Sequence, residues 1–457
     1  MKMNKSSRAK GRGGFGAAGK SKAKSLPNIS AEVVIDRLAH DGRGIAQLDG
    51  KIVFVDHALP LEKHLVKVVA QKSKYSEALS VSIIGDVSTE RREPACAYYA
   101  TCGGCQIQHL APDAQLHFKS NLVQDQLRRA KLNVEPEKVA AIVSKNTLAY
   151  RSRARLSLSH KGSPYAGFKA RANSQIIKID RCLVLDPALD ACLAPLQRAL
   201  IEFRPEVLGH IEMLKTQALP VLVLRHVAAL MEPELDALST LSVETGAEVY
   251  LQPDSSADYY RLDGRRAEIS FTVSVPHLAK PLRYQISNFS QINPDVNYAM
   301  VEQALSWAHP SKEDIWLDLF CGVGNLTLPF AAFAHQVIGV EAIADMVEQA
   351  KANAESLAVT NCKFLAADLE KIESLRKLPK KVDGVILDPP RAGAKSVVEN
   401  ISRLKPKKIL YISCDAATFA RDARTLVESG YDLERVGALD MFPQTMHVET
   451  MALFLLR

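Results

Sequence analysis

The sequence predicts an α/β protein whose last part is a parallel, doubly wound sheet, and three observations support this fold class. Short strands separated by turn signals fill residues 31–89, as in a small β-barrel. Residues 150–285 have mixed, strand-rich patterns. From about Ser287 onward, apolar strands alternate with helical segments, which is typical of a parallel sheet. The predicted domains are a tail at 1–27, a barrel at 28–90, a central domain at 91–285 and a Rossmann-like domain at 286–457.

The composition is that of an ordinary globular protein. The chain has 457 residues, of which 24% are charged and 47% hydrophobic, so a wholly disordered, collagen-like or disulfide-scaffold chain is excluded. No membrane span is expected, because no run of about 18 uncharged apolar residues occurs. No apolar segment of a secretory signal follows the charged start, so we expect a cytoplasmic protein. In that compartment, eight cysteines indicate reduced thiols, a metal site or catalysis.

The excess of positive charge lies at the N-terminus. Residues 1–25 contain eight Lys and Arg residues and no acidic residue. The whole chain has 58 basic and 51 acidic residues, so 50 basic and 51 acidic residues remain outside this segment. We expect a disordered tail, because the segment cannot bury enough apolar surface to order itself. The composition supports two roles equally, a non-specific arm for RNA phosphates or a solubility tail.

The barrel and the helix after it have clear local signals. Asp49-Gly50 lies between two apolar runs, which is a hairpin signal. Small barrels with exposed loops often bind oligonucleotides. Residues 112–132 have the leucine spacing of an amphipathic helix. The barrel strands are expected at 32–37, 45–48, 52–55, 66–71 and 78–84.

A glycine loop follows the strand expected at 315–320. Gly322 and Gly324 let the backbone approach a ligand where a Cβ would clash. A glycine pair alone would equally suit a structural turn, but acids end the next two strands. Glu341 can accept ribose hydroxyls, and Asp368 is placed for an adenine amino group. The loop lacks the third glycine of a pyrophosphate site, so S-adenosylmethionine fits better than NAD.

Two further strands end in groups that could act on a substrate. Asp388 begins a D-P-P-R motif, which is typical of methyltransferases for planar nitrogen substrates or nucleobases. Cys414 is the first residue beyond the strand expected at 408–413, on the ligand edge of the sheet. A lone cysteine on an apolar strand is more often a core residue. Cys321 is a rival thiol, but it would lie beneath the cofactor.

A thiol and a base suit one chemistry in particular. The C5 carbon of a pyrimidine is a poor nucleophile until a thiolate adds to C6, and a base must later remove the C5 proton. Glu449, expected just ahead of the last strand, is the available carboxylate. A surface acid that caps the strand is the alternative interpretation of Glu449.

Three cysteines cluster as Cys96-x5-Cys102-x2-Cys105. Three thiolates and a distant fourth ligand would suit zinc as readily as an iron–sulfur cluster. Disulfides are not expected in the cytoplasm. The spacing alone therefore leaves the metal open.

Taken together, these motifs resemble the RNA uracil-5-methyltransferases, and among them the type that acts on 23S rRNA. The resemblance covers residue 28 to the C-terminus. It implies Cys414 as nucleophile and Glu449 as general base. The motifs are F-x-Q-x-N at 289–293, D-L-F-C-G-V-G-N at 318–325, D-P-P-R at 388–391, S-C at 413–414, H-x-E at 447–449 and C-G-G-C at 102–105. The implied S-adenosylmethionine site consists of Gln291, Phe320, Asn325, Glu341, Asp368 and Asp388.

The resemblance also implies properties of the other domains. It implies a TRAM barrel, which is OB-like, and a helix at 112–133 that packs on the catalytic domain. The implied metal is a [4Fe-4S] cluster in an iron–sulfur domain, with Cys182 as the fourth ligand beside Cys96, Cys102 and Cys105. Cys192 is the rival for that position, but it matches no family motif.

Two positions depart from the family pattern. Asp415-Ala416 replaces the usual Asn-Pro after the nucleophile, which leaves the shape of that loop open. Leu61 stands where the barrel motif A-L-P-G-E has glycine, so that turn is expected to differ.

The function implied is S-adenosylmethionine-dependent methylation of C5 of one uridine in 23S rRNA, number 1939 in the usual rRNA numbering. The base must be flipped out, since a thiol cannot reach C6 inside a stack. The protein is expected to be a monomer with 23S rRNA as its partner and no membrane. The alternatives are the same chemistry at another 23S uridine or in the T-loop of tRNA, and a non-catalytic RNA-binding assembly protein. The barrel and cysteine cluster argue against the tRNA alternative, because the bacterial tRNA enzymes of the family lack both.

Overall fold

The computed structural model forms two compact units. One unit comprises the described residues up to Arg37 together with Arg43–Asp86. The other comprises Leu38–Gly42 and Val87–Arg457. The tail predicted at 1–27 lies outside the described residues. The structure describes residues 29–134, 139–142, 144–160, 162–171, 173–371, 379, 381–401 and 404–457.

The first unit is built on a six-stranded sheet with strand order β1-β5-β6-β4-β3-β2. Its core is small and made of β-branched and small residues, among them Val33, Val55 and Val66. Alternate residues of each strand face this core, as the period of a strand requires. The strands are β1 (Ser30–Val34), β2 (Arg37–Leu38), β3 (Gly44–Leu48), β4 (Lys51–Asp56), β5 (Lys63–Gln71) and β6 (Tyr75–Ile84).

The hairpin between β3 and β4 follows from its sequence. Leu48 pairs with Lys51, so only Asp49 and Gly50 form the turn. Both have positive φ, 49° and 75°. Two central residues with positive φ match the right-handed twist of the strands, and Asp-Gly is a favoured dipeptide there.

Leu61 adopts the backbone conformation that a glycine would prefer. Its φ is 69°, and its side chain is 88% exposed. Its N–H donates to the Ile35 carbonyl at 2.9 Å, so the turn is closed. The turn is therefore left-handed at Leu61, which places a Cβ in a region that L-residues disfavour.

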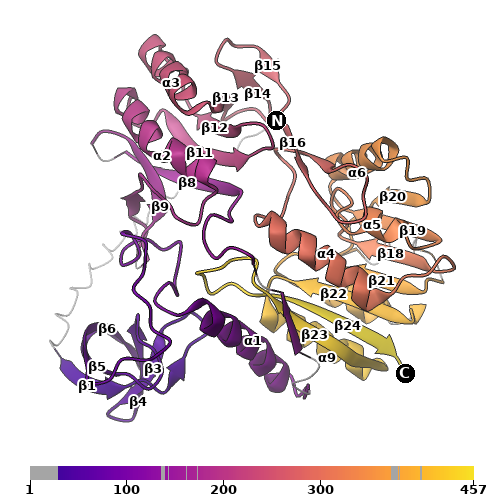
Figure 1. Ribbon diagram of the computed structural model, residues 1–457, viewed down its shortest axis with the longest axis horizontal. Coiled ribbons are helices and arrows are strands. Elements are labelled where there is room, and N and C mark those ends of the chain that lie inside the picture. Colours follow the sequence, from indigo (N-terminus) through magenta and orange to yellow (C-terminus); the bar gives the residue numbers. More distant parts are fainter. Residues whose placement is uncertain are drawn as a thin grey trace, which may run out of the picture. The chain divides into compact units, whose positions relative to one another are not determined.

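The second unit contains the sheet on which the predicted catalytic residues lie (the catalytic sheet), in the order β20-β19-β18-β21-β22-β24-β23-β7 (Figure 1). The first five strands run parallel to one another, whereas β24 runs antiparallel to both β22 and β23. The strands are β18 (Ile315–Leu319), β19 (Gln336–Glu341), β20 (Cys362–Ala366), β21 (Gly384–Leu387), β22 (Lys408–Ser413), β23 (Tyr431–Leu439), β24 (Glu449–Leu456) and β7 (Val139–Ile142).

Helices cover both faces of this sheet. Successive residues of β22 enter opposite cores: Leu410 belongs to one and Tyr411 to the other. Such strands are apolar on both sides, as in doubly wound sheets. One core contains side chains of α4 (Pro294–Ala308), α5 (Thr327–Ala331) and α6 (Ala344–Ser356); the other contains side chains of α1 (Pro112–Arg129), α8 (Lys395–Ile401) and α9 (Ala416–Glu428).

Two elements from earlier in the chain complete this sheet and its cover. Strand β7 extends the sheet edge by pairing with β23, with Ile142 opposite Leu439. Helix α1 packs against α9 and β23, and its Val123 and Leu127 are buried in the same core as Phe419 (Figure 1). The catalytic sheet and its covering helices are therefore discontinuous in sequence.

The central part is a mixed eight-stranded sheet in the order β10-β9-β8-β11-β12-β13-β14-β15. Helices α2 (Pro187–Ala199) and α3 (Glu232–Thr245) contribute Leu193, Leu196 and Leu241 to its core. A separate hairpin pairs β16 (Ser270–Val273) with β17 (Leu282–Gln285). The remaining elements are β8 (Arg153–Ser159), β9 (Tyr165–Lys169), β10 (Ile176–Lys178), the 3₁₀ turn η2 (Leu200–Glu202), β11 (Leu208–Lys215), β12 (Pro220–His226), β13 (Glu248–Pro253), β14 (Tyr259–Arg261) and β15 (Arg266–Ala267).

Some local expectations differ from the structure. Glu449 is the first residue of β24, so the expectation that it precedes the last strand is wrong. Helix α1 ends at Arg129, short of Leu132. No helix within the described ranges has the length and apolar character needed to cross a bilayer.

The strained turn gives a test of local stability. In the full chain, Leu61→Gly should stabilise the first unit by about 0.5–1 kcal/mol, because the left-handed penalty of about 1–2 kcal/mol exceeds the added flexibility of the unfolded chain. Hydrogen exchange of the protected β1 and β5 amides should slow about two- to fivefold. Leu61→Ala keeps the Cβ and should give no gain. Equal effects of Gly and Ala would contradict the strain.

Candidate active site and cysteine cavity

The reactive groups gather at one edge of the catalytic sheet. Strands β18, β19, β21 and β22 are parallel, so their carboxyl ends meet there. Glu341 ends β19, Asp388 follows β21 and Cys414 follows β22. The polar residues predicted from strand ends therefore share an edge.

The antiparallel strand brings Glu449 to the same place. Ser413 pairs with Thr450 across β22 and β24. Cys414 follows Ser413 and Glu449 precedes Thr450, so both adjoin the last pair of this ladder, and the charge of Glu449 acts on the Cys414 thiol. The structure thus places the predicted thiol and the predicted base side by side, although they are far apart in sequence.

Glu449 is a buried carboxyl with spare hydrogen-bonding capacity. The residue is 5% exposed, and its Oε2 atom has no hydrogen-bond partner within the described part of the chain. Burial, and after it the negative charge of Asp388, raise the pKa of Glu449 to about 8. A buried, unpartnered carboxyl oxygen is unusual in a purely structural residue and typical of a reactive one.

The neighbouring groups are electrostatically linked to Glu449. Asp388 keeps partial solvent exposure, but the surrounding protein desolvates its carboxyl and raises its pKa to about 7. Burial raises the pKa of the Cys414 thiol, and the charges of Glu449 and Asp388 raise it further. Arg391, from the D-P-P-R motif, acts in the opposite direction. The free site therefore favours a neutral thiol, since three acidic groups in one desolvated place resist ionising together.

The loop after Cys414 is held by a helix cap. The Asp415 carboxylate accepts hydrogen bonds from the N–H groups of Ala417 at 3.0 Å and Thr418 at 2.8 Å, which caps α9. Thr418 donates its hydroxyl to the Arg391 carbonyl at 3.2 Å. The departure Asp415-Ala416 therefore keeps a side-chain cap on α9, and the capped helix also contacts the D-P-P-R segment.

The glycine loop and Glu341 form the predicted cofactor end of the edge. Gly322 and Gly324 have φ values of 57° and 97°, a conformation that needs glycine. The Glu341 carboxylate accepts from the N–H of Gly322 at 3.2 Å and of Ile343 at 3.0 Å. These two bonds orient the carboxylate at the strand end. Phe320 also has a positive φ, 67°, which is a strained conformation of the kind that gathers at functional sites.

Asn325 is oriented by a residue that the sequence analysis missed. Its side-chain amide and that of Asn297, on α4, exchange two hydrogen bonds of 2.8 and 3.1 Å. Asp318, in the strand before the loop, is buried, and its Oδ2 accepts a hydrogen bond from the Thr327 hydroxyl at 2.5 Å. Burial raises the pKa of Asp318 to about 7. Neither Asn297 nor Thr327 stands out in the sequence, because only folding brings them against the loop.

The remaining two cofactor candidates lie nearer to solvent. The side chain of Asp368 is 44% exposed and pairs with Lys371 at 3.1 Å, and this contact lowers its pKa. Gln291 is partly buried and lines a cavity of about 670 Å³ together with Tyr150 and Asn293. This cavity is lined by the central sheet, the β16 hairpin and the start of α4.

A second cavity contains the four predicted metal ligands. Cys96, Cys102, Cys105 and Cys182 all line one space of about 220 Å³, beside three arginines. The rival Cys192 is fully buried within α2, where its thiol donates to the Ala188 carbonyl at 3.2 Å. Among the residues that the structure describes, no three His, Cys, Asp or Glu side chains stand close enough to hold a single metal ion. The three arginines are Arg151, Arg155 and Arg181.

Comparisons with known proteins show which proteins this chain resembles. Residues 112–457 match the family model described as tRNA (Uracil-5-)-methyltransferase. The chain is similar to the 23S rRNA (uracil(1939)-C(5))-methyltransferase RlmD of Pseudomonas entomophila, with 40% identity over 98% of this chain and 99% of that protein. The protein of the same name from Vibrio campbellii is 39% identical over 92% and 95% of the two chains.

A solved structure has a similar fold. The crystal structure of Pyrococcus abyssi tRNA (uracil-54, C5)-methyltransferase with S-adenosyl-L-homocysteine covers 93% of this chain and 100% of its own, with a TM-score of 0.68. The two sequences are 24% identical, so this likeness concerns the fold alone.

The electrostatic link between Glu449 and Cys414 can be measured in the free protein. Glu449→Gln should lower the pKa of the Cys414 thiol, because it removes a negative charge that is present above about pH 8. Alkylation of Cys414 by iodoacetamide at pH 9, followed by site-resolved mass spectrometry, should become severalfold faster. Asp368→Asn removes a carboxylate outside this group and should leave the rate unchanged. Unchanged alkylation in Glu449→Gln would show that the two side chains are not neighbours.

Proposed function

The chain belongs to the tRNA (uracil-5-)-methyltransferase family, and we propose that it transfers a methyl group from S-adenosylmethionine to C5 of a uridine in 23S rRNA. The specific target proposed is uridine 1939, since the names of its near full-length relatives specify that position. The observation that carries the chemistry is the placement of Cys414 and Glu449 beside the last pair of β22 and β24, where the charge of Glu449 acts on the thiol.

In the proposed reaction, the Cys414 thiolate adds to C6 of the flipped-out uracil and makes C5 nucleophilic. When bound, S-adenosylmethionine supplies an electrophilic methyl group on its sulfonium. The C5–methyl bond forms as the sulfonium–methyl bond breaks, leaving S-adenosylhomocysteine. Glu449 then takes the C5 proton, and the electrons of that C–H bond expel the thiolate from C6.

The raised pKa values suit this order of events. A carboxylate that removes a proton from carbon is most effective when its pKa lies near the working pH, and that of Glu449 is about 8. Asp388 and Glu449 oppose ionisation of Cys414 in the free site. We infer that the thiolate forms mainly once the uracil is in place and disperses the charge.

The residues around the glycine loop fit an adenosine-bearing methyl donor. Glu341 is oriented by two main-chain N–H groups and keeps lone pairs for ribose hydroxyls. Asp368 is solvent-accessible at the next strand end, where an adenine amino group could replace Lys371 as its partner. Asp388 lies between this end and Cys414, and Gln291, Phe320 and Asn325 complete the proposed site.

The cysteine cavity supports a [4Fe-4S] cluster held by Cys96, Cys102, Cys105 and Cys182. Tetrahedral zinc with Zn–S distances of about 2.3 Å would draw its thiolates to within about 3.8 Å of one another, whereas a cubane cluster holds them further apart around a cavity. Four thiolates and a cluster carry net negative charge, which the lining arginines complement. The proposed role is structural, because the methyl transfer has no redox step.

The first unit supports RNA binding of the TRAM type. Its sheet is small, and it carries a partly exposed Arg43 that pairs with Glu77 at 3.6 Å and stacks on Phe54, with 4.6 Å between the guanidinium carbon and the ring centroid. Arginine and aromatic side chains together are favourable to stacked bases and phosphates. A cytoplasmic monomer with 23S rRNA as its partner completes the proposal.

The two catalytic roles separate in one experiment. Cys414→Ala should abolish methylation of 23S rRNA and retain binding of S-adenosylmethionine, because C5 is never activated. Glu449→Gln should form the C6 adduct and transfer the methyl group, but the C5 proton then has no base. A covalent protein–RNA adduct that contains the new methyl group should accumulate and survive denaturing electrophoresis.

The double variant Cys414→Ala/Glu449→Gln should give no adduct, whereas Cys321→Ala/Glu449→Gln should still form it. Normal turnover by Glu449→Gln, or an adduct without Cys414, would refute these roles. Mapping of 5-methyluridine in rRNA from cells with and without the protein tests the site itself.

Iron content tests the cluster separately. The full chain purified without oxygen should be brown and contain about four irons. Cys182→Ser should lose most of the iron and the visible absorbance, whereas Cys192→Ser should retain both, because Cys192 lies outside the cavity. Stoichiometric zinc without visible absorbance would overturn the cluster assignment.

A further inference from the structure

The connection 440–448 joins β23 to β24 and delivers Glu449 to the sheet edge. Leu439 pairs with Glu449, so the connection starts and ends at the same rung of the ladder. The loop therefore leads without any intervening residue into Glu449, the first residue of β24. What holds the loop also holds the proposed base.

Lys119 of α1 is a charged side chain from outside the loop that donates hydrogen bonds to it. It is fully buried. Its Nζ donates to the Asp440 carboxylate at 2.6 Å and to the Phe442 carbonyl at 2.9 Å. Burial lowers the pKa of Lys119, and the charge of Asp440 opposes that shift. One buried ammonium thus binds both the side chain that opens the loop and the main chain two residues on.

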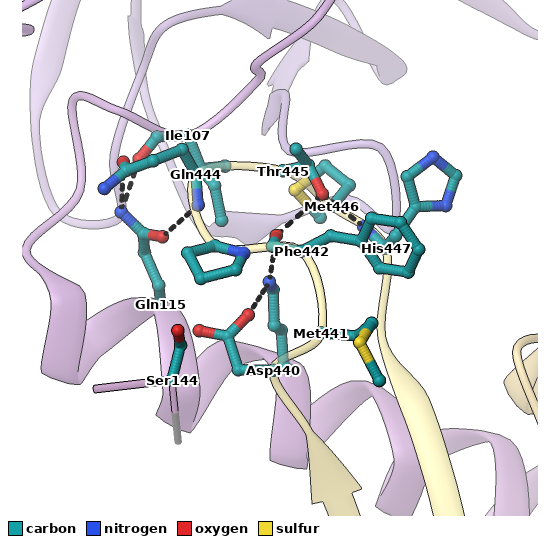
Figure 2. A network of polar contacts seen from close by, with 12 residues as sticks. Ile107, Gln115, Ser144, Asp440, Met441, Phe442, Gln444, Thr445, Met446 and His447 are labelled. Atoms are coloured by element: carbon teal, nitrogen blue, oxygen red, sulfur yellow. Dashed lines mark hydrogen bonds and ion pairs between the residues drawn. The ribbon is translucent and has the colours of Figure 1, made fainter. Parts of the chain in front are cut away.

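Gln115 holds the middle of the loop one helical turn away. Its Oε1 accepts from the Gln444 N–H at 3.0 Å, and its Nε2 donates to the Gln444 side-chain oxygen at 3.0 Å (Figure 2). Gln444 has a left-handed backbone with φ of 67°. A non-glycine residue keeps that conformation only where its surroundings impose it.

Main-chain groups of the loop are satisfied largely from outside it. The Gln444 carbonyl accepts from the N–H groups of Gln106 and Ile107 at 3.0 and 3.2 Å. The Met446 N–H donates to the Gln106 side-chain oxygen at 3.3 Å. Tyr150 donates its hydroxyl to the Pro443 carbonyl at 3.0 Å. The loop therefore has its shape because α1 and the segment after Cys105 bind it (Figure 2).

We propose that Lys119 and Gln115 are positioning residues for the base: through Asp440, Phe442 and Gln444 they hold the loop so that Glu449 meets the C5 proton. This inference rests on the proposed function and adds to it. Neither side chain touches the reacting atoms. Their effect should fall on proton removal, the step that depends on Glu449, and not on S-adenosylmethionine, which binds at the other strand ends.

The test is a single-turnover assay of Lys119→Met on 23S rRNA. Methionine keeps an unbranched apolar side chain as far as Cε and removes the ammonium group. Breakdown of the methylated covalent adduct should slow about tenfold to a hundredfold, because a misplacement of about 1 Å can cost that much. Adduct formation and the dissociation constant for S-adenosylmethionine should change less than about twofold. Equal slowing of both steps, or no slowing, would overturn the proposal.

A surface pair on the same helix provides the matched control. Arg128 pairs with Asp125 at 2.5 Å, and its side chain is 68% exposed. Arg128→Met removes a cation from α1 in the same way, but a solvated pair contributes little. Its adduct should break down at the normal rate. A slowdown equal to that of Lys119→Met would assign the effect to the helix in general and overturn the proposal.

Two further variants separate positioning from stability. Lys119→Met/Asp440→Asn removes the unpaired buried carboxylate, so thermal stability should recover, but adduct breakdown should stay slow because the Phe442 carbonyl still lacks its donor. If the double variant recovered both thermal stability and the normal rate of adduct breakdown, the Lys119–Asp440 pair would have only a structural role. If Lys119→Met does not fold, Gln115→Leu should show the same selective slowing. Glu449→Gln is expected to accumulate the methylated adduct. If it does so, but none of these variants slows adduct breakdown, this inference is refuted and the proposed function stands.

Discussion

Strand β24 runs antiparallel to β22, and the arrangement of the reactive groups depends on that pairing. In a wholly parallel sheet, the edge with the ligand contains only residues that follow strands. An antiparallel strand places its first residue there instead, and in this chain that residue is Glu449, beside Cys414. The pairing also requires β23 and the connection 440–448, so the elements that support the connection become part of the site.

Low polarity then determines how these groups behave. Glu449 is buried, and Asp388 is largely surrounded by protein, so both carboxyls hold protons more strongly than they would in water. Both charges raise the pKa of the Cys414 thiol further. In the proposed reaction the thiolate forms only with its substrate, which protects it from unproductive chemistry.

The catalytic sheet and its covering helices include segments from much earlier in the chain. Strand β7 forms one edge of the sheet, and α1 contributes to the hydrophobic core beneath β22 and β23. The segment after Cys105 binds Gln444 directly. The segment that follows Cys105 is thereby hydrogen-bonded to the connection that leads to Glu449, the proposed base, which offers a structural role for a cysteine-rich loop in an enzyme whose proposed chemistry has no redox step.

The sequence by itself determined the local features: the Asp49-Gly50 hairpin, the apolar strands of the parallel sheet, the glycine loop, and the acids and Cys414 that end those strands. These follow from periodicity and backbone preference, which act over a few residues. The sequence was less informative about Leu61, whose turn is left-handed although leucine disfavours that conformation. It was also less informative about the helices α2 and α3 of the central domain. Only the tertiary structure decided that Glu449 begins β24, that Asn297 orients Asn325 and that Lys119 binds Asp440. Those contacts join residues widely separated along the chain, and their energies depend on burial and register, which exist only once the sheet has formed.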